Sequence, residues 1–228
     1  MTPAFAVLRP EPGNAATTGR IEALGLRAIR LPLFEIRALG WTAPDPAGFD
    51  ALLLTSANAV RFAGRESETL RHLPVLAVGA RTAEVSRAAG FDVMATGRSD
   101  ASSLLSREHR FTRILHLGGR ERSIDTGGAI AQAIAVYASE PLPVTPEALA
   151  TLKGSVALMH SARAAIRLGA LADEHGLSRS SIGIAAFSPA VAEASGTGWA
   201  WIATAALPND KALIEAAIER AAHARLTG

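Results

Sequence analysis

Residues 49–60 read FDALLLTSANAV, in which the apolar run 51–54 (ALLL) is followed by two hydroxyl side chains, Thr55 and Ser56. An uninterrupted apolar run of this length is typical of a strand that is buried on both faces. The Thr-Ser pair that follows is typical of the start of a helix. Similar successions of apolar strand, short polar turn and helix recur along the chain. They predict an α/β fold in which helices cover both faces of a parallel sheet.

Outward from this stretch, the chain repeats itself at a spacing of roughly 105 residues. Three pairs of stretches match in the same order: 53–59 (LLTSANA) with 158–164 (LMHSARA), 78–83 (VGARTA) with 187–192 (FSPAVA), and 90–96 (GFDVMAT) with 198–204 (GWAWIAT). Matches that keep both their order and their spacing predict two similar α/β halves that face each other.

Two proline-rich breaks, near 32–48 and 141–146, divide the chain into three pieces. The first piece is too short to fold alone, so we expect it to complete the third. Residues 130–138 predict a strand only around Val136–Tyr137. The predicted boundaries are 1–33 plus 143–228 for a discontinuous domain, 38–138 for an inserted domain, and connectors near 34–37 and 139–142.

Composition excludes several classes of protein. Apolar residues make up 49% of the chain and charged residues 19%, which excludes disorder over most of it. The absence of Cys excludes a disulfide framework, a Cys-ligated metal site and a Cys nucleophile. No apolar run approaches the roughly 18–20 residues of a membrane span, and residues 1–10 are broken too early for a signal peptide. We therefore expect a soluble, cytoplasmic protein with no membrane partner.

The basic isoelectric point of about 9.6 does not indicate a nucleic-acid partner. The net charge is only +2, and the basic residues are nearly all Arg, so little titrates between neutral pH and the Arg range. The arginines are dispersed among acidic residues instead of forming a patch, so we expect no nucleic acid to bind.

Common catalytic signatures are absent, including dinucleotide and phosphate-loop glycines, GxSxG and HExxH. The six histidines lack the spacing of metal ligands, so we expect no metal. His116 and His160 follow or end predicted strands. Either they are functional, or they are half-buried histidines whose polar atoms bond to the backbone.

Small and hydroxyl-bearing residues gather where predicted strands end and helices begin. They are Thr55, Ser56, Gly79, Thr82, Gly118, Gly119, Ser161 and Ser188. Each one alone is an ordinary helix cap. In parallel sheets, however, ligands bind beyond the carboxyl ends of the strands, where helix N-termini offer free N–H groups. Their number predicts a cleft between the two domains that suits a ligand with many carboxylates or phosphates.

Tyr137, the single tyrosine, lies just before the second proline-rich break. A phenol is a weak acid that can donate a proton to a leaving oxygen. The alternative is a strand tyrosine packed at a domain junction.

Several stretches together resemble the uroporphyrinogen-III synthase family over nearly the whole chain. They are 8–10 (LRP), 31–36 (LPLFEI), 49–60 (FDALLLTSANAV), 77–83 (AVGARTA), 114–119 (ILHLGG) and 136–137 (VY). The resemblance implies two α/β domains joined by a two-stranded connector. It also implies a cofactor-free lyase of haem biosynthesis that cyclises hydroxymethylbilane, a linear tetrapyrrole with eight carboxylates, to uroporphyrinogen III.

The resemblance further implies roles for particular residues. Tyr137 matches the family position proposed to protonate the leaving hydroxyl. Arg9 and Asn58 lie in the matching stretches, and we add them to the hydroxyl and glycine positions above as substrate-binding candidates. We expect a monomer whose domains close around the small-molecule substrate.

Two other classes of function stay open. One is a non-catalytic two-domain protein that binds an anionic metabolite, as a degenerate relative would. The other is a different α/β enzyme, such as a nucleotide-sugar transferase, although the missing phosphate-loop glycines count against it.

Overall fold

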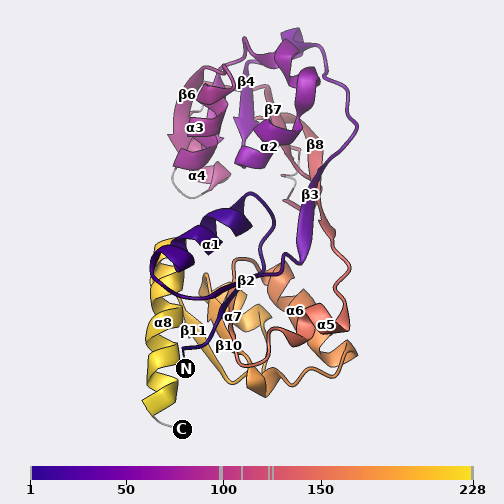
Figure 1. The fold of residues 1–228 in the computed structure, drawn as a ribbon. Helices are drawn as coiled ribbons and strands as arrows, with labels where there is room; N and C mark the ends of the chain where they lie inside the picture. Colours follow the sequence, from indigo (N-terminus) through magenta and orange to yellow (C-terminus); the bar gives the residue numbers. More distant parts are fainter. Residues whose placement is uncertain (1, 98–99, 109, 123, 125, 227–228) are drawn as a thin grey trace. The chain divides into compact units, whose positions relative to one another are not determined.

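In a computed structural model, the chain forms two β-sheets, each built mainly of parallel strands (Figure 1). The structure describes residues 2–97, 100–108, 110–122, 124 and 126–226. The chain divides into two compact units, which are Met1–Glu35 with Pro141–Gly228 (unit 1) and Ile36–Glu140 (unit 2). The prediction of an α/β fold with parallel sheets in two domains is confirmed. Among the described residues, no helix is both long and apolar enough to cross a membrane.

Unit 1 contains a five-stranded sheet. Its elements are β1 (Phe5–Val7), α1 (Gly13–Ala23), β2 (Ala28–Arg30), α5 (Pro146–Ala150), β9 (Val156–Met159), α6 (Ala162–Glu174), η4 (Arg179–Ser181), β10 (Gly183–Ala186), α7 (Pro189–Ala194), β11 (Trp201–Thr204) and α8 (Asp210–Leu226). The strands lie in the order β11-β10-β9-β1-β2, and every neighbouring pair is parallel. Strand β1, from the start of the chain, is therefore hydrogen-bonded to β9, from its second half.

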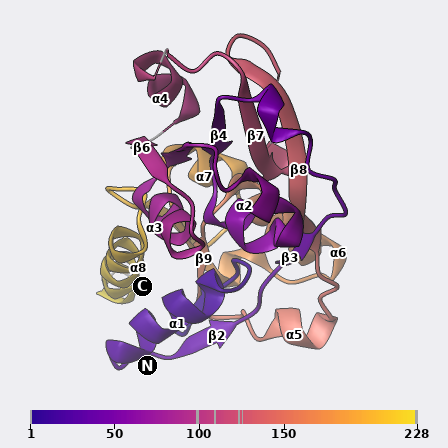
Figure 2. The same ribbon diagram turned by 90° about the horizontal axis from the view of Figure 1, so that it is seen from above.

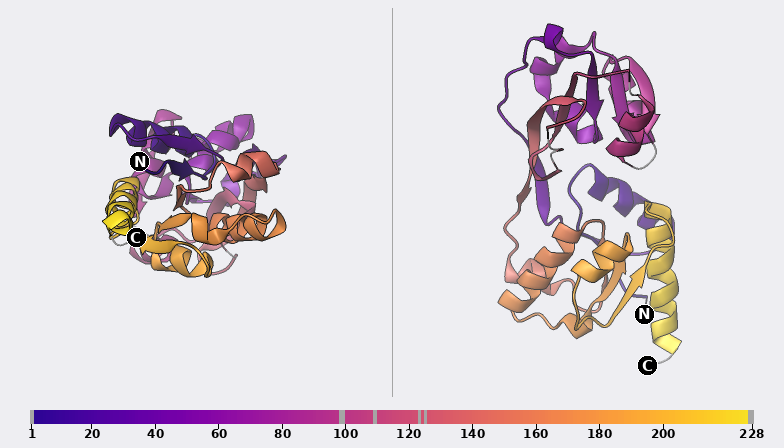
Figure 3. Two further views of the ribbon diagram at one scale, coloured as in Figure 1. Left: turned by 60° about the horizontal axis from the view of Figure 1, so that its bottom comes forward. Right: turned by 180° about the vertical axis from the view of Figure 1, so that it is seen from behind.

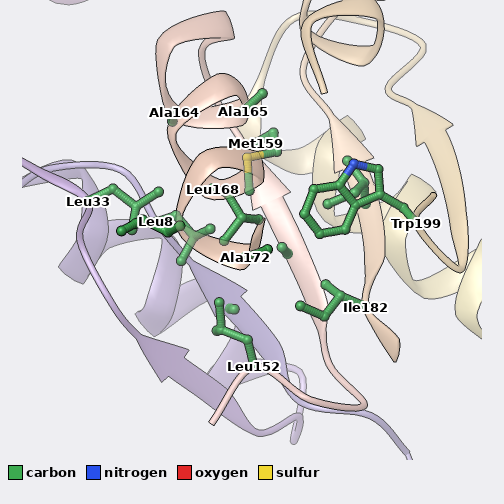
Figure 4. Packing of buried hydrophobic residues seen from close by; sticks show 14 of the residues in the cluster. Leu8, Leu33, Leu152, Met159, Ala164, Ala165, Leu168, Ala172, Ile182 and Trp199 are labelled. Carbon is green, nitrogen blue, oxygen red and sulfur yellow. The ribbon is translucent and has the colours of Figure 1, made fainter. Parts of the chain in front are cut away.

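Both faces of the unit 1 sheet are covered by helices (Figure 3). On one face, Ile21 of α1 and Leu213 of α8 pack against alternate residues of β1. On the other face, Leu168 of α6 packs in one apolar cluster with Met159 of β9 and with Trp199, which precedes β11 (Figure 4). This double burial explains why β9 and β10 are apolar at every position.

Unit 2 contains most of a six-stranded sheet. Its elements are β3 (Phe34–Ala38, which begins in unit 1), η1 (Pro46–Gly48), β4 (Ala51–Leu54), α2 (Ala57–Phe62), η2 (Gly64–Leu70), β5 (Val75–Val78), α3 (Ala80–Ala88), β6 (Val93–Gly97), α4 (Ala101–Arg107), β7 (Ile114–Gly119), η3 (Arg120–Arg122) and β8 (Ile130–Pro141). The strand order is β3-β8-β7-β4-β5-β6, and the five strands from β8 to β6 are parallel.

Helices α2 and α3 lie together on one face of this sheet, and α4 packs on the other (Figure 2). Alternate residues of β4 serve the two faces. Leu52 and Leu54 pack beneath α2 and α3, whereas Leu53 packs with Leu104 of α4. The apolar run that opened the sequence analysis is thus a strand at the centre of its sheet, fully buried on both sides.

The two sheets share one strand order. In unit 2 the order β6-β5-β4-β7-β8 reproduces the order β11-β10-β9-β1-β2 of unit 1. Strands β4 and β9, which carry the repeat between 53–59 and 158–164, hold the same central place. The sequence repeat therefore corresponds to a repeat of architecture.

Two segments differ from the sequence interpretation. Residues 130–138 are strand throughout, because β8 pairs with β7 from Ile130 to Tyr137, and this pairing overrides the helical tendency of its alanines. The proline-rich break at 141–146 also ends in a helix. Pro146 occupies the first turn of α5, where its missing N–H costs nothing, and Thr145 caps that turn by accepting from the Ala148 N–H.

Candidate functional site

The predicted site residues of unit 2 lie at one edge of its sheet. Parallel strands end at a common edge, so the residues at their carboxyl ends become neighbours. Thr55 and Ser56 follow β4, Gly79 follows β5, Gly118 lies near the end of β7, and Tyr137 lies in β8 opposite Gly119. We call this set the unit 2 edge.

A β-bulge places Tyr137. Gly118 pairs with Ala135 and Gly119 pairs with Tyr137, so Val136 is an extra residue at this point of β8. Bulges redirect the side chains next to them. The phenol packs near the ring of Phe62, with 6.4 Å between ring centroids, and the residue as a whole is 8% exposed. A Cβ on Gly119 would lie 2.6 Å from the Tyr137 ring, so only glycine leaves room for the phenol.

His116 lies beneath the same edge, on β7. Its Nε2 is 3.2 Å from the hydroxyl oxygen of Thr55, and the side chain is almost completely buried. Among the described residues, its Nδ1 has no hydrogen-bond partner. Burial lowers the pKa of His116 to about 4, so the imidazole is neutral at pH 7. The imidazole explains why residue 118 is a glycine, because a Cβ at this position would lie 2.6 Å from the His116 ring.

Helix α3 begins without a side-chain cap. Gly79 precedes it with a φ of 88°, a left-handed conformation that favours glycine, and it has no side chain to offer as a cap. The first N–H groups of α3 thus lack a capping oxygen, which makes this helix start the part of the unit 2 edge best suited to an anion. Thr82, in the first turn, is buried, and the substrate contact that we predicted for it stays a prediction.

Three of the predicted hydroxyls act as helix caps. Ser56, Ser161 and Ser188 accept hydrogen bonds from backbone N–H groups in the first turns of α2, α6 and α7, over 3.2, 3.3 and 3.4 Å. Each retains its O–H for a ligand. Asn58, in α2, accepts from Arg61 over 3.1 Å at an exposed position. Substrate binding by these four residues is not tested by the geometry and stays a prediction.

Unit 1 gathers a second set at the carboxyl edge of its own sheet. Arg9 follows β1, and Ser161 and Ser188 follow β9 and β10. Arg9 donates from Nη1 to the Asp210 carboxylate over 3.0 Å, and His160 Nε2 lies 2.9 Å from the same oxygen. We call the residues around this carboxylate (Arg9, Thr17, Arg20, His160 and Asp210) the Asp210 cluster.

Asp210, Thr17 and Arg20 were not among the candidate residues predicted from the sequence. The signal available in the sequence was the composition of α1, GNAATTGRIEA, because a helix with so few large apolar residues must bury polar ones. For His160, the repeat aligned it with Thr55, and both residues indeed follow the central strand of a sheet. Among the described residues, no group of three or more acidic or His side chains is arranged to hold a metal ion.

The two units share one strand order, and each carries polar side chains at the carboxyl edge of its sheet. The protein is therefore an α/β protein of two units, each with a parallel sheet covered by helices on both faces. A family model described as "Uroporphyrinogen-III synthase HemD" matches residues 15–215. The chain belongs to the uroporphyrinogen-III synthase family.

Solved structures agree with this fold. The uroporphyrinogen-III synthetase of Helicobacter pylori 26695 is 16% identical, with a TM-score of 0.65 over 96% of this chain and 100% of that one. A mutant uroporphyrinogen III synthase from the extremely thermophilic bacterium Thermus thermophilus is 17% identical, with a TM-score of 0.53 over 96% of this chain and 98% of that one. A search of curated proteins found no match.

Proposed function

We propose that this protein cyclises hydroxymethylbilane to uroporphyrinogen III, with inversion of ring D and loss of water. The family assignment carries the proposal, because it spans 15–215 and so includes every predicted site residue except Arg9. With this activity the protein would be a lyase of tetrapyrrole biosynthesis, and membership of the family supports that proposal.

The polar groups at the two carboxyl edges support an anionic substrate. Hydroxymethylbilane carries eight carboxylates. The uncapped start of α3 offers N–H groups, the capping serines offer O–H groups, and the Asp210 cluster offers two guanidiniums. Such donors form strong hydrogen bonds to carboxylates. The proposed ligand set is Arg9, Thr55, Ser56, Asn58, Gly79, Thr82, Gly118, Ser161 and Ser188.

The proposed chemistry begins with loss of the hydroxyl from ring A. Tyr137 donates the proton, the hydroxyl leaves as water, and a cation conjugated with the pyrrole remains. Ring D attacks through its substituted carbon, and the resulting spiro intermediate fragments and closes with ring D inverted. The proton that ring D loses on closure returns to the Tyr137 phenolate, which restores the acid. The overall reaction forms one carbon–carbon bond and releases one water with no net oxidation, so its balance calls for no redox cofactor.

The main task of the protein in this reaction is to fold the substrate. Without inversion, the chain closes to the type I isomer through the unsubstituted carbon. A protein that holds the substituted carbon closer to the cation gains rate through orientation. Most of the binding groups are backbone N–H donors and hydroxyls, so single side-chain substitutions in them should cost little activity.

A coupled assay tests the proposal. Hydroxymethylbilane is generated in situ, and the products are oxidised and resolved by chromatography into types I and III. We expect type III product in proportion to the amount of protein. Type I product alone, in the presence of folded protein, would overturn the synthase activity and leave the non-catalytic binding protein as the remaining candidate.

A further inference from the structure

Each oxygen of the Asp210 carboxylate accepts two hydrogen bonds. Oδ1 accepts from Arg9 Nη1 over 3.0 Å and from His160 Nε2 over 2.9 Å. Oδ2 accepts from Thr17 Oγ1 over 2.7 Å and from Arg20 Nη1 over 2.6 Å. Partial burial acts to raise the pKa of Asp210, but the bonds from His160 and Thr17 outweigh it and hold the pKa well below its usual range. Asp210 is therefore a fixed negative charge with no acceptor position to spare.

Helix α1 is shaped to position Arg9. The helix buries three polar side chains and only one apolar one, Ile21. Of these, Asn14 donates from Nδ2 to the carbonyl oxygens of Val7 and Arg9, over 2.7 and 3.0 Å, which fixes the backbone beside the arginine. A Cβ on Gly13 would lie 2.4 Å from Arg9 Nε, so this glycine admits the guanidinium. A helix needed only for packing would place apolar residues on this face.

The cluster carries a net positive charge on its accessible side. Arg9 and Arg20 are 34% and 56% exposed, whereas Asp210 and His160 beneath them are 13% and 7% exposed. Burial lowers the pKa of His160, so at pH 7 two guanidiniums face one carboxylate. Each guanidinium donates to Asp210 through Nη1, and Arg9 Nη1 also lies 3.5 Å from Thr17 Oγ1. Within the described residues, Nε and Nη2 of both arginines have no hydrogen-bond partner.

We propose that Arg9 and Arg20 bind a carboxylate of the substrate and that Asp210 is the positioning residue that holds both guanidiniums in place. This inference rests on the proposed function for the identity of the ligand. Guanidiniums recognise carboxylates through pairs of N–H groups in a fixed plane, so their orientation matters as well as their charge.

A positioning role for Asp210 and a purely electrostatic role predict opposite changes in affinity when Asp210 is replaced by Asn. Replacing Asp210 by Asn removes a negative charge beside an anion site, which by Coulomb attraction would tighten binding. If Asp210 instead positions the arginines, the same substitution weakens binding. Arg20→Gln removes one of the two ligands and should weaken binding as well.

The experiment titrates the full chain with uroporphyrin III, the stable octacarboxylate obtained by oxidising the expected product, and follows fluorescence quenching. We expect Asp210→Asn and Arg20→Gln each to raise the Kd about tenfold, the effect of one lost charge-assisted hydrogen bond. Arg20→Lys, which keeps the charge but not the fork, should fall between. Arg27→Gln is the matched control, because Arg27 is exposed on the same unit just before β2, at the opposite edge of the sheet.

Three results would overturn the proposal: unchanged or tighter binding by folded Asp210→Asn, an Arg20→Gln effect no larger than that of Arg27→Gln, or no binding of uroporphyrin III by the wild type. Melting temperatures establish that each variant is folded. If Asp210→Asn does not fold, the Arg20 variants decide.

Turnover separates this inference from the proposed function. We expect Asp210→Asn to raise KM for hydroxymethylbilane with kcat nearly unchanged, a split that general loss of structure would not produce. A wild type that makes type III product while its variants bind normally refutes the positioning role alone. A wild type that binds through these arginines but makes only type I product refutes the synthase activity alone.

Discussion

Tyr137 and His116 lie on adjacent strands of unit 2, and their surroundings give them different chemical capacities. Tyr137 keeps a small exposed fraction beside Gly119. His116 lies deeper, against Thr55, and its lowered pKa keeps the imidazole neutral at pH 7. Of the two, Tyr137 is the more exposed, at 8% against 1%, and it stays the candidate acid, whereas His116 can hydrogen-bond Thr55.

Removing the Tyr137 hydroxyl should impair catalysis and leave the fold intact. We expect Tyr137→Phe to lower kcat roughly 10–100-fold, which is the usual contribution of a general acid. The ring contact with Phe62 is retained, so the melting temperature should hardly change. Steady-state kinetics in the coupled assay measure the effect, with Phe62→Leu as a packing control. Unchanged kcat would mean that water or another group supplies the proton.

His116 should make the stability of unit 2 depend on pH. Its pKa is about 4 in the folded protein and about 6.5 in the unfolded chain, so the unfolded state takes up the proton first as the pH falls. The free energy of unfolding should therefore be unaffected above about pH 6.5 and decrease between pH 6.5 and 4, by up to about 3 kcal/mol. Urea titrations of wild type and His116→Gln at several pH values measure the difference.

His72 provides the control for this titration, because it is exposed on the same unit. The pH dependence of His116→Gln should be shallower than those of the wild type and of His72→Gln. Parallel curves for all three proteins would show that His116 gains its proton as easily in the folded state as in the unfolded one.

At the scale of single elements, helix starts are where structure and function are hardest to separate. Ser161 caps the 13-residue helix α6, and the same oxygen lies at the carboxyl edge where a ligand is expected. Sequence alone cannot distinguish the two roles, because a capping serine and a ligand-binding serine occupy the same position before a helix. The uncapped start of α3 differs, since nothing in the described structure occupies its N–H groups through a side chain.

Ser161→Ala separates these roles. Loss of a cap costs about 1 kcal/mol, so we expect the free energy of unfolding to fall by that amount while kcat/KM changes less than about threefold. Denaturant unfolding and steady-state kinetics on the same preparation measure both quantities. An activity loss far larger than the loss of stability would make Ser161 a principal substrate ligand.

Strand β8 shows where local sequence fails. Its alanines favour a helix when they are considered alone, and only Val136 and Tyr137 read as strand. The extended conformation comes from pairing with β7, which lies earlier in the chain. The bulge at Val136 is likewise a property of the pair, so the environment of Tyr137 could not be predicted although the residue itself could.

For the whole molecule, the fold class and the repeat were accessible from the sequence, whereas the Asp210 cluster was not. The apolar run 51–54 and its counterpart at 156–159 mark buried central strands without any structural information. Arg9 and Asp210 are 201 residues apart and meet in the folded unit, where α1, α8 and β1 share one apolar cluster. No local pattern records such a contact, and only the unusual polarity of α1 hinted at it.

Unit 2 should fold when it is separated from unit 1. It is formed by one continuous stretch, and it has apolar clusters on both faces of its own sheet. We expect a fragment of residues 34–142, which keeps the whole of β3 and β8, to unfold cooperatively in urea, followed by circular dichroism, and to show no synthase activity. A fragment that stays unfolded at all temperatures would show that unit 2 depends on unit 1 for its stability.

The place of β1 inside its sheet, between β9 and β2, also bears on how the chain folds during synthesis. Its partner β9 ends at Met159, so about 150 residues must be translated after β1 before the two can pair. At elongation rates of about 5–20 residues per second, this takes roughly 8–30 seconds. During that interval the segment with the apolar FAVL stretch can pair only with β2, while the inserted unit can already mature. This chain should therefore benefit from chaperones that shield short hydrophobic segments early in synthesis.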